Sequence, residues 1–365
     1  MSEPIRNLYA PDHVSPPGES LQEVLEMRGM SQAELADRTG RPKKTINEII
    51  KGKAAITPET ALQLELVLGI PASFWINREQ HYRESLARQE ENELFETHVA
   101  WLDQVPYRVM VEMGWIPKRH DKSEQVQEVL RFFGVASPAS WNELWQGEQA
   151  IFRRSRSFRS EPGAIAAWLR KGEIEAHKIE CAQYEAARFK EVLGTIRGLT
   201  RNLPRTFPSI VIKECSTAGV RVVFVPELPG TRAWGATRWL TSTSALVQLS
   251  LRYKTDDHLW FTFFHEAGHI LLHGKRDAFL ESDDEERNQK ELEADAFALE
   301  WLIPDREYKQ FKRLGARSCA AVSRFAYQLG IAPGVVVGRL QHDGTLAHTE
   351  CNHLKRRVDW IFGSD

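Results

Sequence analysis

The chain has 365 residues, of which 42% are hydrophobic and 27% charged, and its formal net charge at pH 7 is −2. This length predicts two or three domains, and the hydrophobic content is sufficient for folded cores. The near-neutral balance excludes nucleic-acid binding through overall basicity, so any such binding must come from a local patch. No apolar run approaches the roughly 18 residues of a membrane span, and the N-terminus does not have the pattern of a signal peptide. We therefore expect a cytoplasmic protein with no membrane partner.

Four short helices are predicted near the N-terminus. Within residues 18–28 the apolar side chains follow a helical spacing, and Ser31 with Glu34 forms a capping box that opens the second helix. Gly40 ends that helix, and Pro42 suits the first turn of the next one. The expected helices are 18–28, 31–39, 43–51 and 57–69. Two short helices joined by a turn that contains glycine match a helix-turn-helix, in which the N-terminal residues of the second helix face the base edges of DNA.

The segment around the third helix is basic. Residues 41 to 53 carry five basic side chains and one acidic side chain, and five minus one gives a net charge of +4. Thr45 and Asn47 add uncharged hydrogen-bonding groups that suit contact with bases. The alternative is a solvated basic helix on a small bundle. Because motif and charge agree, we predict binding to double-stranded DNA. The predicted contacts are Arg41, Lys43, Lys44, Thr45, Asn47, Lys51 and Lys53.

The segment from Pro17 to Trp75 resembles the XRE-type helix-turn-helix, and most closely the HigA family of antitoxins. The motifs that carry the resemblance are Pro17-Gly18-Glu19, Leu35-Ala36, Lys44-Thr45-Ile46-Asn47-Glu48-Ile49-Ile50, Gly52-Lys53, Ala55-Ile56-Thr57-Pro58-Glu59-Thr60-Ala61 and Phe74-Trp75. The resemblance implies a homodimeric repressor that binds a palindromic operator and often opposes a toxin encoded beside it. HigA antitoxins are usually short and lack a peptidase domain, so the length of this chain departs from that pattern.

Residues 79–204 are predicted to form a helical connector. They contain many aromatic side chains, and such a stripe belongs more often to a core than to a ligand site. The connector is expected to dimerise, to hold the following domain or to bind a toxin, and composition does not choose among these roles.

Strands are predicted after the connector. Residues 219–225 contain four valines, and residues 219–225 and 245–250 both show partial alternation. Residues 235–240 are expected to form either an edge strand or an ordinary strand inside the sheet. An edge strand beside a metal would pair with an extended substrate by strand addition.

The most informative motif is His265-Glu266-Ala267-Gly268-His269, which lies in an apolar stretch. Two side chains four residues apart lie about 40° apart on one face of a helix, so both imidazoles can bind one metal ion. Glu266 can then take a proton from a water molecule held by the metal. The alternative is a buried helix whose histidines have no shared role.

A second helix can complete the site, because a catalytic zinc usually takes three protein ligands and keeps one position open. Glu291 and Asp295 are four residues apart and share a face, whereas Glu293 points to the opposite side. We therefore predict Glu291 as the third ligand and Asp295 as an acceptor for an N–H of a ligand histidine. Glu293 is the alternative ligand.

His273 extends the histidine series by one more turn. It lies too far along the axis to join the same metal easily. It is expected either to donate a hydrogen bond to the substrate oxyanion or to cap the end of the helix before Gly274.

The pattern H-E-x-x-H-x-x-x-H, followed by E-x-x-A-D-x-F-A-x-x-x-L-I-P, resembles the ImmA/IrrE family of metallopeptidases. The matching residues are His265, Glu266, His269, His273, Glu291, Ala294, Asp295, Phe297, Ala298, Leu302, Ile303 and Pro304. The resemblance implies a gluzincin-like fold with Zn²⁺ on His265, His269 and a glutamate, and with Glu266 as catalytic base.

The expected fold is therefore multidomain and mainly α, with an α+β part. It comprises a helix-turn-helix bundle at residues 15–78, the helical connector at 79–204 and a gluzincin-like peptidase domain at 205–350. A second helix-turn-helix is conceivable around 329–344. Residues 355–357 are expected to be a solvated tail, and the acidic run 281–286 a solvated loop. The four cysteines are far apart in the sequence, so we expect them to be reduced.

Together these features predict a DNA-binding regulator, either an antitoxin or a stress-response repressor, whose zinc domain hydrolyses a peptide bond. The substrate or bound partner is expected to be a toxin, another regulator or the chain's own linker. The competing hypothesis keeps the DNA binding and makes the zinc domain a sensor or a toxin-binding surface without catalysis.

Overall fold

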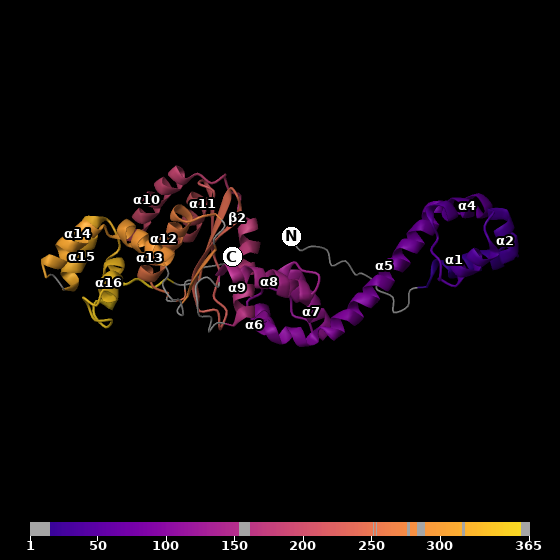
Figure 1. Ribbon diagram of the computed structural model, residues 1–365, viewed down its shortest axis with the longest axis horizontal. Coiled ribbons are helices and arrows are strands. Elements are labelled where there is room, and N and C mark those ends of the chain that lie inside the picture. Colours follow the sequence, from indigo (N-terminus) through magenta and orange to yellow (C-terminus); the bar gives the residue numbers. More distant parts are fainter. Residues whose placement is uncertain are drawn as a thin grey trace. The chain divides into compact units, whose positions relative to one another are not determined.

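The structure is a computed structural model that describes residues 15–152, 161–250, 252, 254–275, 278–282, 289–315 and 318–358. The chain divides into two compact units, Met1–Val99 and Ala100–Asp365, each with its own core (Figure 1). We describe each unit by itself. The division into three domains that was expected from the sequence stays a prediction.

The first unit is a helical bundle. Its helices are α1 (Pro17–Met27), α2 (Gln32–Thr39), α3 (Lys43–Ile50), α4 (Pro58–Leu68) and α5 (Ala72–Thr97). The Ser31 side chain accepts a hydrogen bond from the Glu34 amide at 3.1 Å, which caps α2. Gly40 then takes a left-handed conformation, with φ of 69°, and turns the chain into α3. The boundaries predicted for the first four helices are confirmed within one or two residues.

The core of the first unit comes from one face of each helix. Leu21, Leu35, Ile46, Leu64 and Trp75 are all fully buried. Burial of these side chains fixes α3 on the bundle and leaves its other face to solvent. The local geometry is that of a helix-turn-helix.

The second unit opens with helices, as predicted for the connector. These are the 3₁₀ helix η1 (Val99–Gln104) and α6 (Tyr107–Glu112), α7 (Lys122–Phe133), α8 (Pro138–Phe152), α9 (Pro162–His177), α10 (Ala186–Asn202) and α11 (Phe207–Ser216). The aromatic residues Trp101, Trp141 and Trp168 are buried, which confirms their role in a core. The Trp168 indole donates to the Val225 carbonyl at 3.0 Å, so α9 packs against the sheet. This part of the connector therefore holds the following domain.

A mixed four-stranded sheet lies at the centre of the second unit. It consists of β1 (Val220–Phe224), β2 (Ala233–Thr241), β3 (Ser244–Leu249) and β4 (Phe279–Ser282), in the order β1-β3-β2-β4. β1 and β3 are parallel, whereas β2 is antiparallel to both of its neighbours. The expectation of an edge strand at 235–240 is wrong, because β4 pairs with β2 along residues 233–237. The alternative, an ordinary strand inside the sheet, is what the structure shows.

One helix packs on this sheet, and a second helix runs antiparallel beside the first. α12 (Asp256–Leu272) carries the histidine motif, and α13 (Gln289–Leu302) returns beside it. Phe264 of α12 stacks on Trp301 near the end of α13, whereas His269 lies against Glu291 near its start. α12 is buried on nearly all sides, and its aromatic and aliphatic residues form the centre of the core.

The remaining elements are α14 (Asp305–Arg313), α15 (Cys319–Leu329), α16 (Pro333–His342) and the 3₁₀ helix η2 (Asn352–Leu354). α15 and α16 meet at 117°, but Gly334, Val335 and Val336 at the start of α16 are buried. They cannot face DNA bases, so the idea of a second helix-turn-helix here is not supported. Among the described residues, no single helix is long and apolar enough to cross a membrane. The bent α15–α16 pair resembles a membrane span only in its length and composition.

Two further expectations need correction. Cys319 and Cys351 form a disulfide, so the prediction of reduced cysteines is wrong for this pair, while Cys181 and Cys215 are free. The expected solvated tail is also wrong, because Lys355 pairs with Asp257 at 2.6 Å. Most of the acidic run 281–286 lies outside the described residues.

Candidate metal centre and DNA-binding helix

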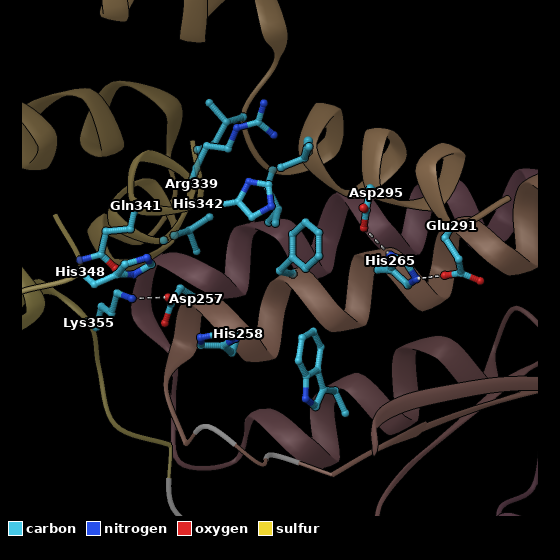
Figure 2. A pocket seen from close by; sticks show the side chains of 17 residues that line it. Asp257, His258, His265, Glu291, Asp295, Arg339, Gln341, His342, His348 and Lys355 are labelled. Atoms are coloured by element: carbon cyan, nitrogen blue, oxygen red, sulfur yellow. Dashed lines mark hydrogen bonds and ion pairs between the residues drawn. The ribbon is translucent and has the colours of Figure 1, made fainter. Parts of the chain in front are cut away.

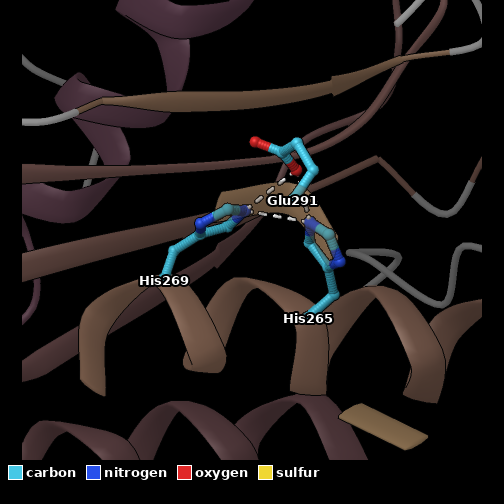
Figure 3. Close-up of side chains that lie close together, drawn as sticks. All are labelled: His265, His269 and Glu291. Atoms are coloured by element: carbon cyan, nitrogen blue, oxygen red, sulfur yellow. Dashed lines mark hydrogen bonds and ion pairs between the residues drawn. The ribbon is translucent and has the colours of Figure 1, made fainter. Parts of the chain in front are cut away.

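Three side chains from α12 and α13 converge on one point in the second unit (Figure 3). The Nε2 atoms of His265 and His269 lie 2.9 Å apart. Glu291 Oε2 lies 3.0 Å from the first of these atoms and 3.2 Å from the second. All three residues are buried. The helical spacing and the face argument therefore bring together the residues that the sequence singled out.

Each histidine of this cluster is oriented by an outer partner. His265 Nδ1 lies 3.0 Å from Asp295 Oδ1. His269 Nδ1 lies 2.9 Å from His273 Nδ1, and His273 Nε2 lies 3.3 Å from Glu293 Oε2. We assign the Nδ1 proton of His265 to the bond with Asp295, and the Nδ1 proton of His269 to the bond with His273. Both Nε2 atoms then carry lone pairs directed at Glu291.

This arrangement separates the two glutamates and places His273. Glu291 is 5% exposed, whereas the Glu293 side chain is 46% exposed. Of the three histidines, Glu293 contacts only His273. The geometry therefore favours Glu291 over Glu293 as a ligand. The His273 amide bonds to the His269 carbonyl as the C-cap of α12, and both of its ring nitrogens have partners. This favours the helix-cap alternative over the oxyanion donor.

The electrostatics of the cluster suit a cation. Burial lowers the pKa of His269 to about 4, which keeps the imidazole neutral at pH 7. Two imidazole lone pairs and a carboxylate oxygen thus face one another in a buried place. Such acceptors fit around a shared positive charge far better than around each other.

The donor set fits zinc in particular. Two imidazole nitrogens and one carboxylate are the three protein ligands found in one class of catalytic zinc sites. His265, His269 and Glu291 would hold the ion, while Asp295 and His273 keep the imidazoles in place.

Glu266 is placed by a close approach of α12 to the sheet. Its side chain is fully buried. A Cβ atom added to Gly235 of β2 would lie 2.3 Å from Glu266 Oε1, so only glycine leaves room for this carboxylate. The Thr237 hydroxyl also donates to the Glu266 carbonyl at 3.2 Å. Sequence reasoning missed Gly235, although a glycine inside a strand is a known sign of close approach.

A cavity of about 360 Å³ opens beside the cluster (Figure 2). His265, Glu291 and Asp295 line one end of it. It extends along α12 between α13 and α16, and its walls combine apolar and polar side chains. The candidate metal centre therefore has space beside it for part of a peptide.

The predicted DNA-contacting residues gather on and beside α3 in the first unit. Lys43, Lys44, Lys51 and Lys53 are exposed, while Thr45 and Asn47 are partly buried. Lys44 lies 3.8 Å from Glu48 one turn later, so its charge is only loosely neutralised. Arg41 is tied to α4 by a bond from its Nε to Gln63 Oε1 at 2.5 Å. The first turn of α3 contains no acidic residue, which leaves its N-terminal end suited to a phosphate.

Two family descriptions match the chain. Residues 21–75 match the helix-turn-helix family, and residues 215–340 match the IrrE N-terminal-like domain. Among curated proteins, the uncharacterised HTH-type transcriptional regulator YddM of Escherichia coli is 35% identical over 74 residues, which cover 20% of this chain and 77% of that protein. The chain belongs to the helix-turn-helix transcriptional regulators. This regulator carries an IrrE-like domain of the metallopeptidase type behind its helix-turn-helix, which confirms the two resemblances found in the sequence.

Two solved structures are also similar to this regulator. An addiction module antidote protein of the HigA family from Coxiella burnetii is 29% identical, covers 23% of this chain and 94% of its own, and has a TM-score of 0.22. The Pseudomonas aeruginosa antitoxin HigA with the higBA promoter is 27% identical, covers 23% and 94% of the two chains, and also has a TM-score of 0.22.

Proposed function

We propose that this regulator binds operator DNA through its first unit and hydrolyses a peptide bond of a partner protein through its second unit. The observation that carries the enzymatic part is the convergence of His265, His269 and Glu291 within 3.2 Å of one another, on a helix that also carries Glu266. The fixed tautomers support a centre built to bind a metal.

Each residue of the site has a separate role in peptide hydrolysis. Zinc held by His265, His269 and Glu291 would polarise the substrate carbonyl and lower the pKa of the attacking water towards 7. The Glu266 carboxylate takes a proton from that water and passes it to the nitrogen of the leaving amine. Asp295 and His273 do not contact the substrate, but they hold the two imidazoles in position. Gly235 lets the Glu266 carboxylate lie close to β2.

The DNA-binding part rests on the helix-turn-helix match and on the exposed lysines of α3. Lys43 and Lys44 bind backbone phosphates, and Thr45 and Asn47 reach base edges in the major groove. Arg41, Lys51 and Lys53 widen the basic surface. We propose a homodimer that reads two half-sites of a palindrome, because one short recognition helix covers only one half-site.

The biological setting that fits both units is a cytoplasmic antitoxin or stress-response repressor. The names of the similar HigA structures support the antitoxin part. The peptide bond that is cut then belongs to a toxin or to a partner regulator. In the competing hypothesis the IrrE-like domain binds a toxin or a signal without catalysis, and the geometry of α12 serves only to hold a metal.

The substitution Glu266→Gln separates these two hypotheses. It keeps the size of the side chain but removes the proton acceptor, so cleavage should fall by a factor of at least about 100 while zinc content and DNA binding stay unchanged. Cleavage of candidate partners, zinc content and gel retardation of promoter DNA measure the three properties. If repression, neutralisation of a neighbouring toxin and any induced response all survive the substitution, the peptidase hypothesis is wrong.

The triple substitution of Lys43, Lys44 and Thr45 by alanine tests the DNA-binding part. Loss of two phosphate contacts and one base contact should weaken operator binding by about tenfold to a thousandfold and reduce its dependence on salt. A matched control replaces Lys309, which lies on α14 in the other unit. Unchanged retardation of promoter DNA by the triple variant would refute this assignment.

A further inference from the structure

The cavity beside the candidate metal centre has two chemically different ends. In Figure 2, His265, Glu291 and Asp295 lie on one side, and Lys355, His348 and Gln341 lie on the other. The rest of the lining is mixed. Its apolar residues are Phe261, Leu299, Leu302, Ile303 and Val335, and its polar residues include His258, Arg339 and His342. The cavity therefore links the reaction site to a separate polar end.

α12 itself gives the length of the cavity. Asp257, Phe261 and His265 are spaced by four residues and all line it. At 1.5 Å per residue, the eight residues from Asp257 to His265 span about 12 Å. An extended peptide covers about 3.3 Å per residue. The far end therefore lies about three or four substrate residues from the bond that would be cut.

The far end of the cavity presents hydrogen-bond donors. The Lys355 ammonium lies 2.6 Å from Asp257 Oδ2, which occupies one of its three N–H groups. Asp257 also lines the cavity, but it is only 6% exposed. His348 lies at the same end and is exposed, whereas His342 lies nearer the middle of the cavity and contacts Asp343 through Nδ1. An incoming group at the far end thus meets an ammonium and one imidazole.

This end of the cavity is held firmly in place by the C-terminal part of the chain. The Gln341 amide donates to the carbonyls of Ala347 and Glu350, at 3.3 and 2.9 Å. The disulfide joins Cys351 to α15. The Arg356 amide donates to Asp256 Oδ1 at 3.0 Å, and the Asp256 amide donates to the Arg356 carbonyl at 2.9 Å. The Gln341 bonds, the disulfide and the Asp256–Arg356 bonds together fix the segment that carries His348 and Lys355 beside the cavity.

Much of this wall lies beyond the residues that match the IrrE N-terminal-like domain. The match to the IrrE N-terminal-like domain ends at residue 340, whereas Gln341, His342, His348 and Lys355 all follow it. The matched residues thus supply the candidate metal centre and Asp257, and the segment after the match supplies His348 and Lys355. Such a division is expected when a common reaction is directed to a particular substrate.

We propose that Lys355 and His348 bind a carboxylate of the peptide substrate and so determine which peptide is cut. The carboxylate is either the side chain of an aspartate or glutamate three or four residues from the cleaved bond, or the C-terminal carboxylate of the substrate. Apolar residues of the substrate occupy the stretch in between. The cutting itself rests on the proposed function, but the binding of the carboxylate does not and can be measured without it.

Peptide binding to the full-length chain tests the proposal. The probes are fluorescein-labelled octapeptides of alanine and leucine, amidated at the C-terminus, with one glutamate at each position in turn and a glutamine twin for each. A further peptide has no glutamate and a free C-terminal carboxylate. Zinc-loaded Glu266→Gln protein prevents turnover while fluorescence anisotropy reports affinity. We expect one glutamate position, or the free carboxylate, to bind about tenfold tighter than its neutral twin.

Variants of residues at the far end of the cavity test which side chains cause the preference for a carboxylate. In the same Glu266→Gln background, His348→Ala and Lys355→Met should each abolish it and leave the affinity for the neutral twin unchanged. Only the His348 backbone, and not its ring, is bonded to Asn352 among the described residues, so His348→Ala is not expected to disturb the fold. The matched controls are His353→Ala, in the same segment but outside the cavity lining, and Lys309→Met on α14. Both should keep the preference.

The outcomes distinguish this inference from the proposed function. If no glutamate position and no free carboxylate improves binding, or if the preference survives both His348→Ala and Lys355→Met, the inference is overturned. If the preference is present but protein with Glu266 intact cleaves none of the peptides or candidate partners, the carboxylate site stands and the peptidase function fails.

Discussion

The helix-turn-helix and the candidate metal centre draw on different lengths of chain. In the first unit, Ser31 caps the helix that begins with the next residue, and the bond between Arg78 and Ser15 spans 63 residues. In the second unit, His265 contacts residues 26 and 30 positions later, and Asp256 is bonded to Arg356 across 100 residues. A change far along the chain should therefore damage the metal centre and spare the DNA-binding helix.

The largest expected effect concerns the choice between two nearby glutamates. Glu291→Ala removes a ligand from the buried cluster and should lower zinc affinity by a factor of more than about 100. Glu293→Ala removes only the outer partner of His273, so its effect should stay within about tenfold. Zinc content after dialysis against graded chelator measures both. Equal losses in the two variants would contradict the assignment of Glu291.

A smaller effect is expected where the sheet touches Glu266. Gly235→Ala places a methyl group against Glu266 Oε1, so the carboxylate must shift by about 1 Å and turnover should fall about a hundredfold. Zinc content and operator binding should not change, because neither depends on this contact. Gly194→Ala on α10 is the matched control, since a Cβ there meets no atom within 4 Å. Wild-type turnover in Gly235→Ala would refute the proposed position of the catalytic carboxylate.

The smallest effect concerns stability against pH. Burial, together with the neighbouring charge of Asp257, raises the pKa of Asp256 to about 6, whereas hydrogen bonds from the Arg356 and Asp257 amides oppose the rise. Because the folded state holds this proton more tightly than the unfolded state does, the free energy of unfolding falls as pH rises from about 4 to about 6 and stays reduced above that range. Asp256→Asn keeps the acceptor for the Arg356 amide but cannot ionise.

Calorimetry of the two melting transitions checks this prediction. At pH 7.5 the variant should be more stable than the wild type by about 1–3 kcal/mol in the second unit, and at pH 4 the difference should vanish. The transition of the first unit should not move at either pH. A shift in both units would show that they do not unfold independently.

The reach of the contacts also explains how much could be predicted from the sequence. The helices of the first unit were predicted almost to the residue because Ser31, Gly40 and Pro42 act on their immediate neighbours. His265, His269 and Glu291 were found because helical spacing alone decides which side chains share a face. Asp295 followed from the same argument.

Other features could not be predicted, because nothing local marks them. β4 contains only four residues, and its pairing covers a strand that was expected at the edge. The disulfide joins cysteines 32 positions apart. The sequence predicts a solvated tail at Lys355, because a basic run carries no information about a buried acid almost 100 residues earlier. The role of Gly235 depends on the approach of a helix that its own strand does not specify.

The bonds between the start of α12 and residues 356–358 also determine which unit can fold first during synthesis. The amide of Val358 donates to the carbonyl of Lys254, just before the helix that carries the histidines. The first unit is complete once residue 99 has left the ribosome, whereas α12 gains its last partners about 260 residues later. At about 5–20 residues per second, that interval is on the order of 13–50 seconds. The DNA-binding unit of a newly made chain can therefore fold well before the candidate metal centre is closed, so under the proposed function DNA binding precedes peptide hydrolysis.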